Sequence, residues 1–311
     1  MSEYVFGVDL GGTTVKLGLF DLAGNVLDKW EIVTRKENNG EYILPDIAKA
    51  VLDKMSEKNI EKASVKGVGI GVPGPVDSEG KISVAVNLGW GAKDIVGELE
   101  KLTGMSVKAG NDANVAALGE MWKGGGQGFS NLVVVTLGTG VGGGIIIDGK
   151  MLVGATGAGG EIGHIHMVDG EEETCGCGNK GCLEQYTSAT GIARLARRKL
   201  ANNTKKTILH QEGNTAKDVF DAVKQGDEVA IEVAEQFGEC LGKGLASIAA
   251  VTNPEVFVIG GGVSKAGTVL FDYIEKYYQQ YAFSGCKKAV FRLATLGNDA
   301  GIYGSAKLVI D

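Results

Sequence analysis

The sequence predicts an α/β protein made of two related halves that face each other across a cleft. Apolar, β-branched runs typical of buried strands are mixed with amphipathic helical stretches along all 311 residues, a pattern typical of α/β folds. The 50 glycines gather in short clusters at the ends of these runs, where a bare backbone lets a ligand approach closely. Residues 8–21 (VDLGGTTVKLGLFD) and 135–148 (VTLGTGVGGGIIID) share one plan in matching register, which indicates an internal duplication.

The first half begins with strands and continues with helices and strands in turn. Hydrophobic periodicity predicts strands at 4–10, 15–20 and 26–33, and an amphipathic helix at 41–58. The segment VKGVGIGV, residues 65–72, is apolar on both faces, as a strand covered on both sides of its sheet would be. SVKAGND then predicts a short strand, and ANVAALGEMW directly after it has the periodicity of a helix.

The second half opens on a strand pair, NLVVVTLGTG and GGGIIIDG. The polar segment 201–216 predicts a loop with broken helix. Residues 229–251 predict a long helix that stops at Asn-Pro. Its apolar stripe consists of Val233, Phe237, Leu241, Leu245 and Ile248. EVFVIGGGV predicts another buried strand, followed by a helix, a strand at 289–295 and a last helix from about Ala300.

Composition limits the partners. The formal net charge is −7, which argues against nucleic acid or an anionic membrane surface as a bulk partner. No apolar run is long enough to span a bilayer, and the start, MSEYVFGVDLGG, lacks the basic segment and apolar core of a signal peptide. We therefore expect a cytoplasmic protein, in which clustered cysteines indicate metal binding or catalysis rather than disulfides.

Two glycine clusters match the dinucleotide-binding pattern G-x-G-x-x-G but lack its context. GTGVGG continues into the apolar strand GIIIDG, and GIGVPG continues into the turn PVDSEGK. The dinucleotide site requires a helix to open at the glycines. Neither segment predicts such a site, and no G-x-x-x-x-G-K-[ST] motif is present.

Asp9 lies inside an apolar strand and is followed by the turn Gly11-Gly12-Thr13-Thr14, with Lys16 nearby. Free backbone N–H groups and hydroxyls in such a turn can cradle phosphate, and the acid can hold Mg²⁺ directly or through water. A glycine hairpin that hydrogen-bonds Asp9 explains this turn alone equally well. The second copy, Gly138-Thr139-Gly140, favours two opposed turns that grip one polyphosphate.

Asn111 and Asp112 stand at a strand end just before a helix. Asp is a favoured N-cap, which accounts for this placement without any function. The alternative is a carboxylate at the mouth of a cleft that accepts the proton of a hydroxyl nucleophile, as phosphoryl transfer requires.

Three cysteines, Cys175, Cys177 and Cys182, fall within eight positions. With His164 from GGEIGHIH they predict a Cys₃His zinc site, and the closed set of four ligands is typical of a structural metal. Glu184 lies two residues after Cys182, and we expect its side chain to point into the same cleft as Asp112. We interpret His166 as an ordinary surface or packing histidine, Cys240 as a core residue and Cys286 as a thiol without a partner. We expect the acidic stretch DGEEET before Cys175 to form a loop that projects from the surface.

The sequence resembles the ROK family of sugar kinases and sugar-responsive repressors over nearly its whole length, and its bacterial glucose kinases in particular. The resemblance rests on blocks that occur in the family's order: VDLGGTTVK, GVPGPVD, NLGW, GNDAN, TLGTGVGGG, EIGH, CGCGNKGCLEQ, VIGGGVS and LGNDAGIYGSA. It implies an actin-like ATPase fold of two ribonuclease-H-like lobes with a cleft between them. The implied small lobe comprises residues 1–111 and 300–311, and the large lobe residues 112–299.

The resemblance also implies roles for individual residues. Asp112 matches the catalytic base, and because a loose transition state acidifies the hydroxyl before the proton moves, it does not require a raised pKa. The residues that match the hexose-binding set are Asn87, Asn111, Asp112, Glu161, His164 and Glu184. Those that match the ATP-binding set are Asp9, Gly11, Gly12, Thr13, Thr14, Lys16, Gly138, Thr139, Gly140 and, on the adenosine side, Gly260, Gly261 and Gly262. His164, Cys175, Cys177 and Cys182 match the zinc ligands.

The implied activity is transfer of phosphate from ATP, with Mg²⁺, to the 6-hydroxyl of glucose by a homodimer or homotetramer. LEQYTS and LGNDAGIYGSA favour glucose, while N-acetylmannosamine, fructose or allose remain alternative sugars and polyphosphate an alternative donor. A sugar-sensing repressor would carry a helix-turn-helix domain before the first phosphate turn, and we expect none, since that turn follows residue 9. An inactive sugar-binding protein is disfavoured by the intact Asp112.

Overall fold

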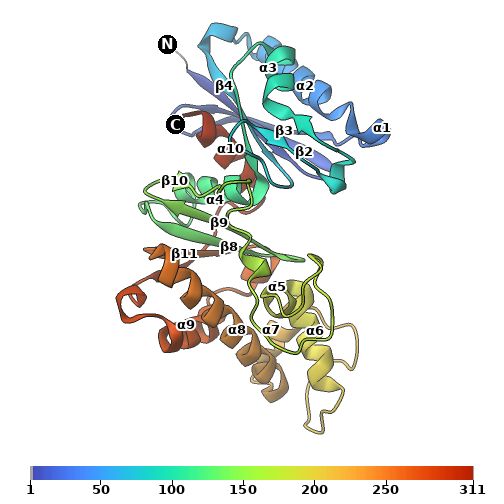
Figure 1. The fold of residues 1–311 in the computed structure, drawn as a ribbon, viewed down its shortest axis with the longest axis vertical. Coiled ribbons are helices and arrows are strands. Elements are labelled where there is room, and N and C mark those ends of the chain that lie inside the picture. Colours follow the sequence, from blue (N-terminus) through green and yellow to red (C-terminus); the bar gives the residue numbers. More distant parts are fainter. Residues whose placement is uncertain (1–2, 311) are drawn as a thin grey trace.

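The computed structural model describes residues 3–310 and contains two five-stranded sheets of the same design (Figure 1). The first sheet has the order β3-β2-β1-β4-β7 and the second β10-β9-β8-β11-β12. In each sheet the first three strands in sequence pair antiparallel and the last two join in parallel. The predicted internal duplication is therefore confirmed, and β1–β2 corresponds to β8–β9.

The strands form where the apolar runs predicted them. In the first sheet they are β1 (Tyr4–Leu10), β2 (Thr14–Asp21), β3 (Val26–Val33), β4 (Val65–Val72) and β7 (Val107–Asn111). In the second they are β8 (Leu132–Leu137), β9 (Val141–Ile147), β10 (Lys150–Met151), β11 (Val256–Gly260) and β12 (Val290–Leu293). A small hairpin joins β5 (Lys81–Ile82) to β6 (Lys93–Asp94).

Each sheet has its own core. The first sheet is accompanied by three helices of the N-terminal half: α1 (Glu37–Gly40), α2 (Ile43–Lys58) and α3 (Ile95–Thr103). Apolar side chains of α2 and α3 share one buried cluster with β1, β2 and β4. The larger core joins β8, β9 and β11 to the helices of the C-terminal half. These helices are α5 (Glu184–Thr187), α6 (Ala189–Leu200), α7 (Ala216–Lys224), α8 (Glu228–Thr252) and α9 (Val269–Tyr281).

Two helices lie between the sheets and join the halves (Figure 1). The helix α10 (Ala300–Ile310) packs on β1 and β4, whereas α4 (Asp112–Lys123) packs on β9, and the two helices pack on each other. Their backbones touch, since a Cβ added to Gly304 would lie 1.7 Å from the carbonyl oxygen of Val115. Only glycine permits this approach.

Most predicted elements are confirmed, with three differences. The segment 201–215 contains no helix, and α6 and α7 flank it. The N-cap of α4 is Asn111, whose side chain accepts hydrogen bonds from the backbone N–H groups of Ala113 and Asn114, so the interpretation of Asp112 as the cap is wrong. Cys240 is buried as predicted, but Cys286 does have a partner, because its thiol donates to the carbonyl oxygen of Ala249.

Among residues 3–310, no helix combines the length and apolar character needed to cross a membrane.

Candidate active site

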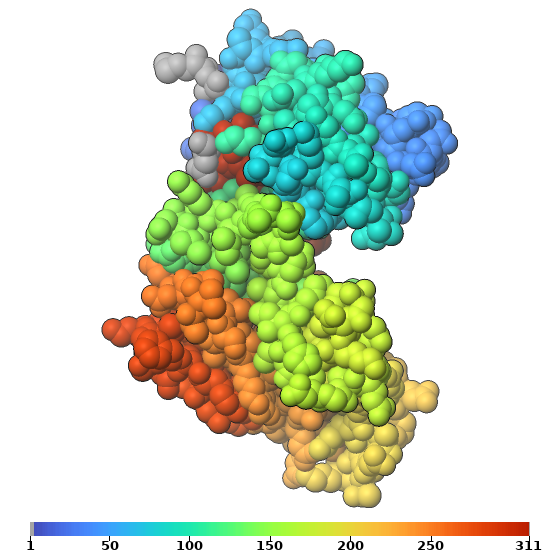
Figure 2. Space-filling model, in the orientation of Figure 1, coloured from blue at the N-terminus to red at the C-terminus, as the bar shows by residue number. Residues whose placement is uncertain are grey.

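The molecule is hollowed on one side between the N-terminal half and the segment around residues 160–190 (Figure 2). The carboxyl ends of β1, β7 and β8 lead into the polar segments that the sequence singled out. Such strand ends in α/β sheets are the usual place for ligands.

The first of the two glycine turns, predicted to bind phosphate, joins β1 to β2. The N–H of Gly11 donates to the carbonyl oxygen of Thr14 at 3.0 Å, and the hydroxyl of Thr34 donates to the carbonyl oxygen of Gly11 at 2.7 Å, which fixes the turn. Asp9 lies at its base, where burial raises the pKa of its carboxyl and the charge of Lys16 opposes that rise. A buried carboxylate beside a phosphate-sized turn suits a divalent cation.

The second turn joins β8 to β9 and is held from the opposite side by the α5–α6 segment. The N–H of Ala189 donates to the carbonyl oxygen of Gly138 at 2.8 Å, and the Thr190 hydroxyl donates to that of Thr139 at 2.7 Å. Glu184 accepts the N–H of Val141 at 3.0 Å. The duplicated turns therefore belong to different halves, and Glu184 is attached to the second.

A pocket of about 330 Å³ lies next to the second turn, and its walls are mainly apolar. Its lining includes Ala189, Ala216, Phe220, Gly262, Val263 and Ala266. The glycine run after β11 packs closely on β8, because a Cβ on Gly261 would lie 2.5 Å from the carbonyl oxygen of Leu137. The size and character of this pocket suit a nucleobase with its ribose. Sequence analysis predicted Gly262 as a binding residue but did not predict the residues of α7 that line the pocket. The polar segment before α7 gave no clear signal of where this helix begins.

Asp112 occupies the first turn of α4, and its surroundings make it more basic than an ordinary aspartate. Burial raises the pKa of Asp112 to about 6, and the negative charges of Asp9 and Glu161 add to that rise. The side-chain amide of Asn111 donates to Asp112 Oδ1 at 3.1 Å and to the carbonyl oxygen of Gly74 at 3.2 Å. The role of base does not require a raised pKa, and burial of Asp112 raises it nonetheless.

We expect turnover to depend on this ionisation. A carboxylate accepts a proton only when ionised, so kcat/KM for the sugar should fall about tenfold per pH unit below about 6, the pKa of Asp112 in the free protein, and level off above it. Initial rates at sugar concentrations well below KM and saturating ATP, from pH 5 to 8, measure this, with circular dichroism as the control for folding. A profile that stays flat down to pH 5 in a folded enzyme would contradict the assignment.

The three clustered cysteines and His164 meet at one point. Their ligand atoms all lie within 4.8 Å of one another. The Cys177 and Cys182 sulfurs are 3.6 Å apart, and Cys175 Sγ is 3.7 Å from His164 Nδ1. A disulfide needs sulfurs about 2.05 Å apart, whereas a tetrahedron with bonds of about 2.3 Å has edges of about 3.8 Å. The four residues thus fit a tetrahedral zinc ion.

His164 and Glu184 connect this cluster to the rest of the site. The Nδ1 atom of His164 faces the thiols, and its Nε2 atom lies 3.9 Å from a carboxylate oxygen of Glu161. Cys175 Sγ donates to Glu184 Oε1 at 3.2 Å, while the other oxygen of Glu184 holds the second phosphate turn. The structure thereby groups Glu161, His164 and Glu184. Asn87 stays apart from this group and is exposed in the short turn 86–88.

The segment that precedes Glu161 is also attached to α4 through a residue that sequence analysis missed. Asn114, one turn after Asn111 on α4, is buried and donates from its amide nitrogen to the carbonyl oxygen of Gly159 at 3.2 Å. In the sequence, only the position of Asn114 inside the block GNDAN could have indicated that it belongs to the site.

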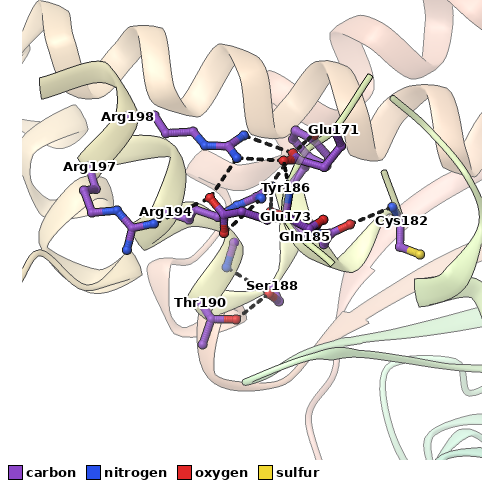
Figure 3. Close-up of polar contacts among 11 residues, drawn as sticks. Glu171, Glu173, Cys182, Gln185, Tyr186, Ser188, Thr190, Arg194, Arg197 and Arg198 are labelled. Atoms are coloured by element: carbon purple, nitrogen blue, oxygen red, sulfur yellow. Dashed lines mark hydrogen bonds and ion pairs between the residues drawn. The ribbon is translucent and has the colours of Figure 1, made fainter. Parts of the chain in front are cut away.

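The acidic stretch 169–174 before Cys175 is exposed as predicted, with the exception of Glu171. Glu171 is buried and receives two hydrogen bonds from Arg198, of 3.0 and 2.7 Å, and one from the Tyr186 hydroxyl (Figure 3). Arg194 adds an ion pair at 3.1 Å. The hydrogen bonds from Arg198 hold the pKa of Glu171 well below its usual range, although burial opposes them. This ion-pair cluster fastens the segment before Cys175 to α6.

The two equivalent sheets, the pair of facing glycine turns and the cleft carboxylate define the class of two-lobed, actin-like ATPase folds that hold a nucleotide between their halves. Comparison with known proteins identifies the family. The ROK family model matches residues 5–311, so the chain belongs to the ROK family.

Glucokinases are prominent among its relatives. The chain is 44% identical to the glucokinase of Halalkalibacterium halodurans, with 99% of this chain and 95% of that protein covered. It is 37% identical to the glucokinase of Thermotoga maritima, with 98% and 96% covered. The structure of a ROK family glucokinase from Streptomyces griseus in complex with glucose and AMPPNP superimposes with a TM-score of 0.75 at 34% identity, and covers 98% of both chains.

Proposed function

We propose that this protein is a glucokinase that transfers the γ-phosphate of ATP to the 6-hydroxyl of D-glucose. The observation that carries the proposal is Asp112, a largely buried carboxylate with a pKa of about 6 that stands near Asp9 and Glu161 in the cleft between the halves. Its position suits a base for a hydroxyl nucleophile. The full-length similarity to glucokinases supports glucose as the sugar and ATP as the donor.

The chain's residues divide the work as follows. Asp112 accepts the proton of the attacking hydroxyl. Asn111, Glu161, His164 and Glu184 bind the other sugar hydroxyls and so select which one reaches Asp112, and Asn87 contributes from its turn when the lobes close. The turns Gly11–Thr14 and Gly138–Gly140 bind the phosphates with Lys16, and the pocket beside Gly260–Gly262 takes the adenosine. Mg²⁺, held by Asp9 directly or through water, would offset the charge of the phosphates.

Zinc in this proposal has a structural role. His164, Cys175, Cys177 and Cys182 would hold it through one imidazole nitrogen and three sulfurs, and a closed set of four ligands leaves no position for a reacting group. Metal ligation at Nδ1 of His164 would leave Nε2 as an N–H donor toward the sugar.

The lobe boundaries and the assembly belong to the same proposal. A small lobe of residues 1–111 and 300–311 and a large lobe of 112–299 agree with the separate cores of the two sheets. A homodimer or homotetramer would cover the exposed apolar side chains of Val251 and Phe283, which are 86% and 69% exposed.

Initial rates for a panel of hexoses with ATP and with polyphosphate test the proposal. We expect the highest kcat/KM for glucose with ATP, and N-acetylmannosamine, fructose and allose at least about tenfold lower, because a site that reads hydroxyls penalises each unmatched polar group. Higher kcat/KM for another sugar would reassign the substrate. Sugar binding without phosphate transfer from either donor would show a sugar-sensing protein instead.

A further inference from the structure

Glu120, near the end of α4, is a buried acid that the proposed chemistry does not use. It is only 2% exposed. Its carboxylate accepts three backbone N–H groups: Gly125 at 2.8 Å, Thr295 at 3.1 Å and Leu296 at 2.9 Å. No ion pair of Glu120 is found among residues 3–310, so backbone dipoles alone offset the burial of this group.

The three donors lie on two segments, of which one leads from the C-terminal half back to the first sheet. Gly125 belongs to the segment that leads from α4 to β8, and Thr295 and Leu296 belong to the segment that leads from β12 to α10. One carboxylate therefore ties the connection into α10 to the end of α4 and to the segment that leaves α4. The contact adjoins the place where α4 and α10 touch, since a Cβ on the neighbouring Gly119 would lie 2.3 Å from the carbonyl oxygen of Ala300.

The same helix begins at Asp112. Eight residues separate Asp112 from Glu120, about 12 Å along a rigid helix. A change in how the connection into α10 sits against the end of α4 would therefore move or tilt the start of the helix. Misplacement of a reacting group by about 1 Å can cost about a hundredfold in rate.

We infer that Glu120 is a positioning residue for phosphate transfer: it clamps the connection between β12 and α10 to the end of α4 and so sets where Asp112 stands when the lobes close on their ligands. This inference rests on the proposed kinase function. It predicts that Glu120 acts on turnover and on the coupling between the two substrates, rather than on the binding of glucose alone.

Glu120→Gln tests the inference with little change in size. The amide keeps one acceptor oxygen but turns an NH₂ group toward a backbone donor, so at least one of the three hydrogen bonds is lost. We expect kcat to fall about ten- to hundredfold, with glucose KM changed by less than about threefold. In the wild type we expect glucose to increase the affinity for AMPPNP, and such couplings are typically about 5- to 150-fold. The variant should lose most of this increase, which calorimetric titration of AMPPNP with and without glucose measures.

Glu255→Gln is the matched control. The Glu255 carboxylate also accepts two backbone N–H groups, from Ser130 at 3.0 Å and Asn131 at 2.9 Å, but neither residue belongs to the connection between β12 and α10. Its substitution should lower the melting temperature while kcat and the substrate coupling stay at wild-type values.

The outcomes separate the two proposals. A wild-type protein that phosphorylates no hexose would overturn the proposed function. A wild-type kinase in which Glu120→Gln behaves like Glu255→Gln would overturn the clamp alone. If Glu120→Gln does not fold, amide hydrogen exchange in the wild type decides: the amides of Gly125, Thr295 and Leu296 should open together with one protection factor, and independent opening of the two segments would reject the clamp.

Discussion

Asp112→Asn is expected to lower kcat by about 10²- to 10⁴-fold, the usual contribution of a general base, while glucose still binds. Asparagine has the shape of aspartate and keeps an acceptor oxygen, so the polar contacts of the first turn of α4 can persist. The amide, however, cannot accept the proton of the sugar hydroxyl. Steady-state kinetics together with direct glucose titration measure the two effects separately.

The same substitution is expected to stabilise the fold. Because the folded-state pKa of Asp112 is raised from 3.8 to about 6, its carboxyl favours folding at pH below 3.8, and that contribution is lost as pH rises through about 6. Asparagine resembles the protonated form. At pH 8 the variant should therefore gain stability of at most about 3 kcal/mol, since one pKa unit corresponds to about 1.36 kcal/mol.

Asp148→Asn is the control for this experiment, because Asp148 is exposed, lies outside the cleft and has a left-handed backbone that asparagine tolerates. It should change neither turnover nor stability appreciably. Asp112→Asn with turnover preserved and only KM altered would show that Asp112 binds the sugar without acting as its base.

Cys177→Ser is expected to remove zinc and weaken glucose binding by about 100-fold or more, more than the 10- to 100-fold typical of residues that only support a ligand. Cys177 is the exposed member of the cluster, so the substitution disturbs little packing. A zinc ion at this cluster would fix His164 and the loop that carries Glu161, and Glu184 contacts Cys175 directly. ATP binding should change by less than about twofold, because the adenosine pocket includes none of the metal ligands.

Metal analysis of the purified protein with separate glucose and AMPPNP titrations measures this. His166→Gln is the control, since His166 lies in the same loop, is exposed and is not part of the metal cluster. A metal-free protein that binds glucose normally would show that the ion-pair cluster around Glu171 suffices to order the loop.

The strands and the paired turns could be predicted because they depend on neighbours in sequence. Apolar runs such as VKGVGIGV fold into buried strands wherever they meet a partner, and the repeated plan of residues 8–21 and 135–148 is visible without coordinates. The metal ligands could be found because three cysteines fall within eight positions.

Features that depend on distant partners could not be predicted in this way. Glu171 reads as a surface acid until Arg198, 27 residues away, is placed against it. Two of the three donors to Glu120, Thr295 and Leu296, lie 175 and 176 positions further along the chain. The pKa of Asp112 on α4 depends on burial and on Asp9, which lies on β1. In each case the energy comes from desolvation and long-range pairing, which no local pattern encodes.

The position of α10 has a consequence for biosynthesis. Its buried side chains Ile302, Ala306 and Val309 cover Val5 and Phe20 of the first sheet. During translation these strands leave the ribosome long before α10 exists, so one apolar face of the N-terminal sheet stays open while the C-terminal half is made. The C-terminal half, which has its own core, can fold first, and the earliest segment to emerge is among the last to be completed. Nascent chains that stall before α10 therefore expose an apolar sheet surface, the kind of surface that chaperones bind.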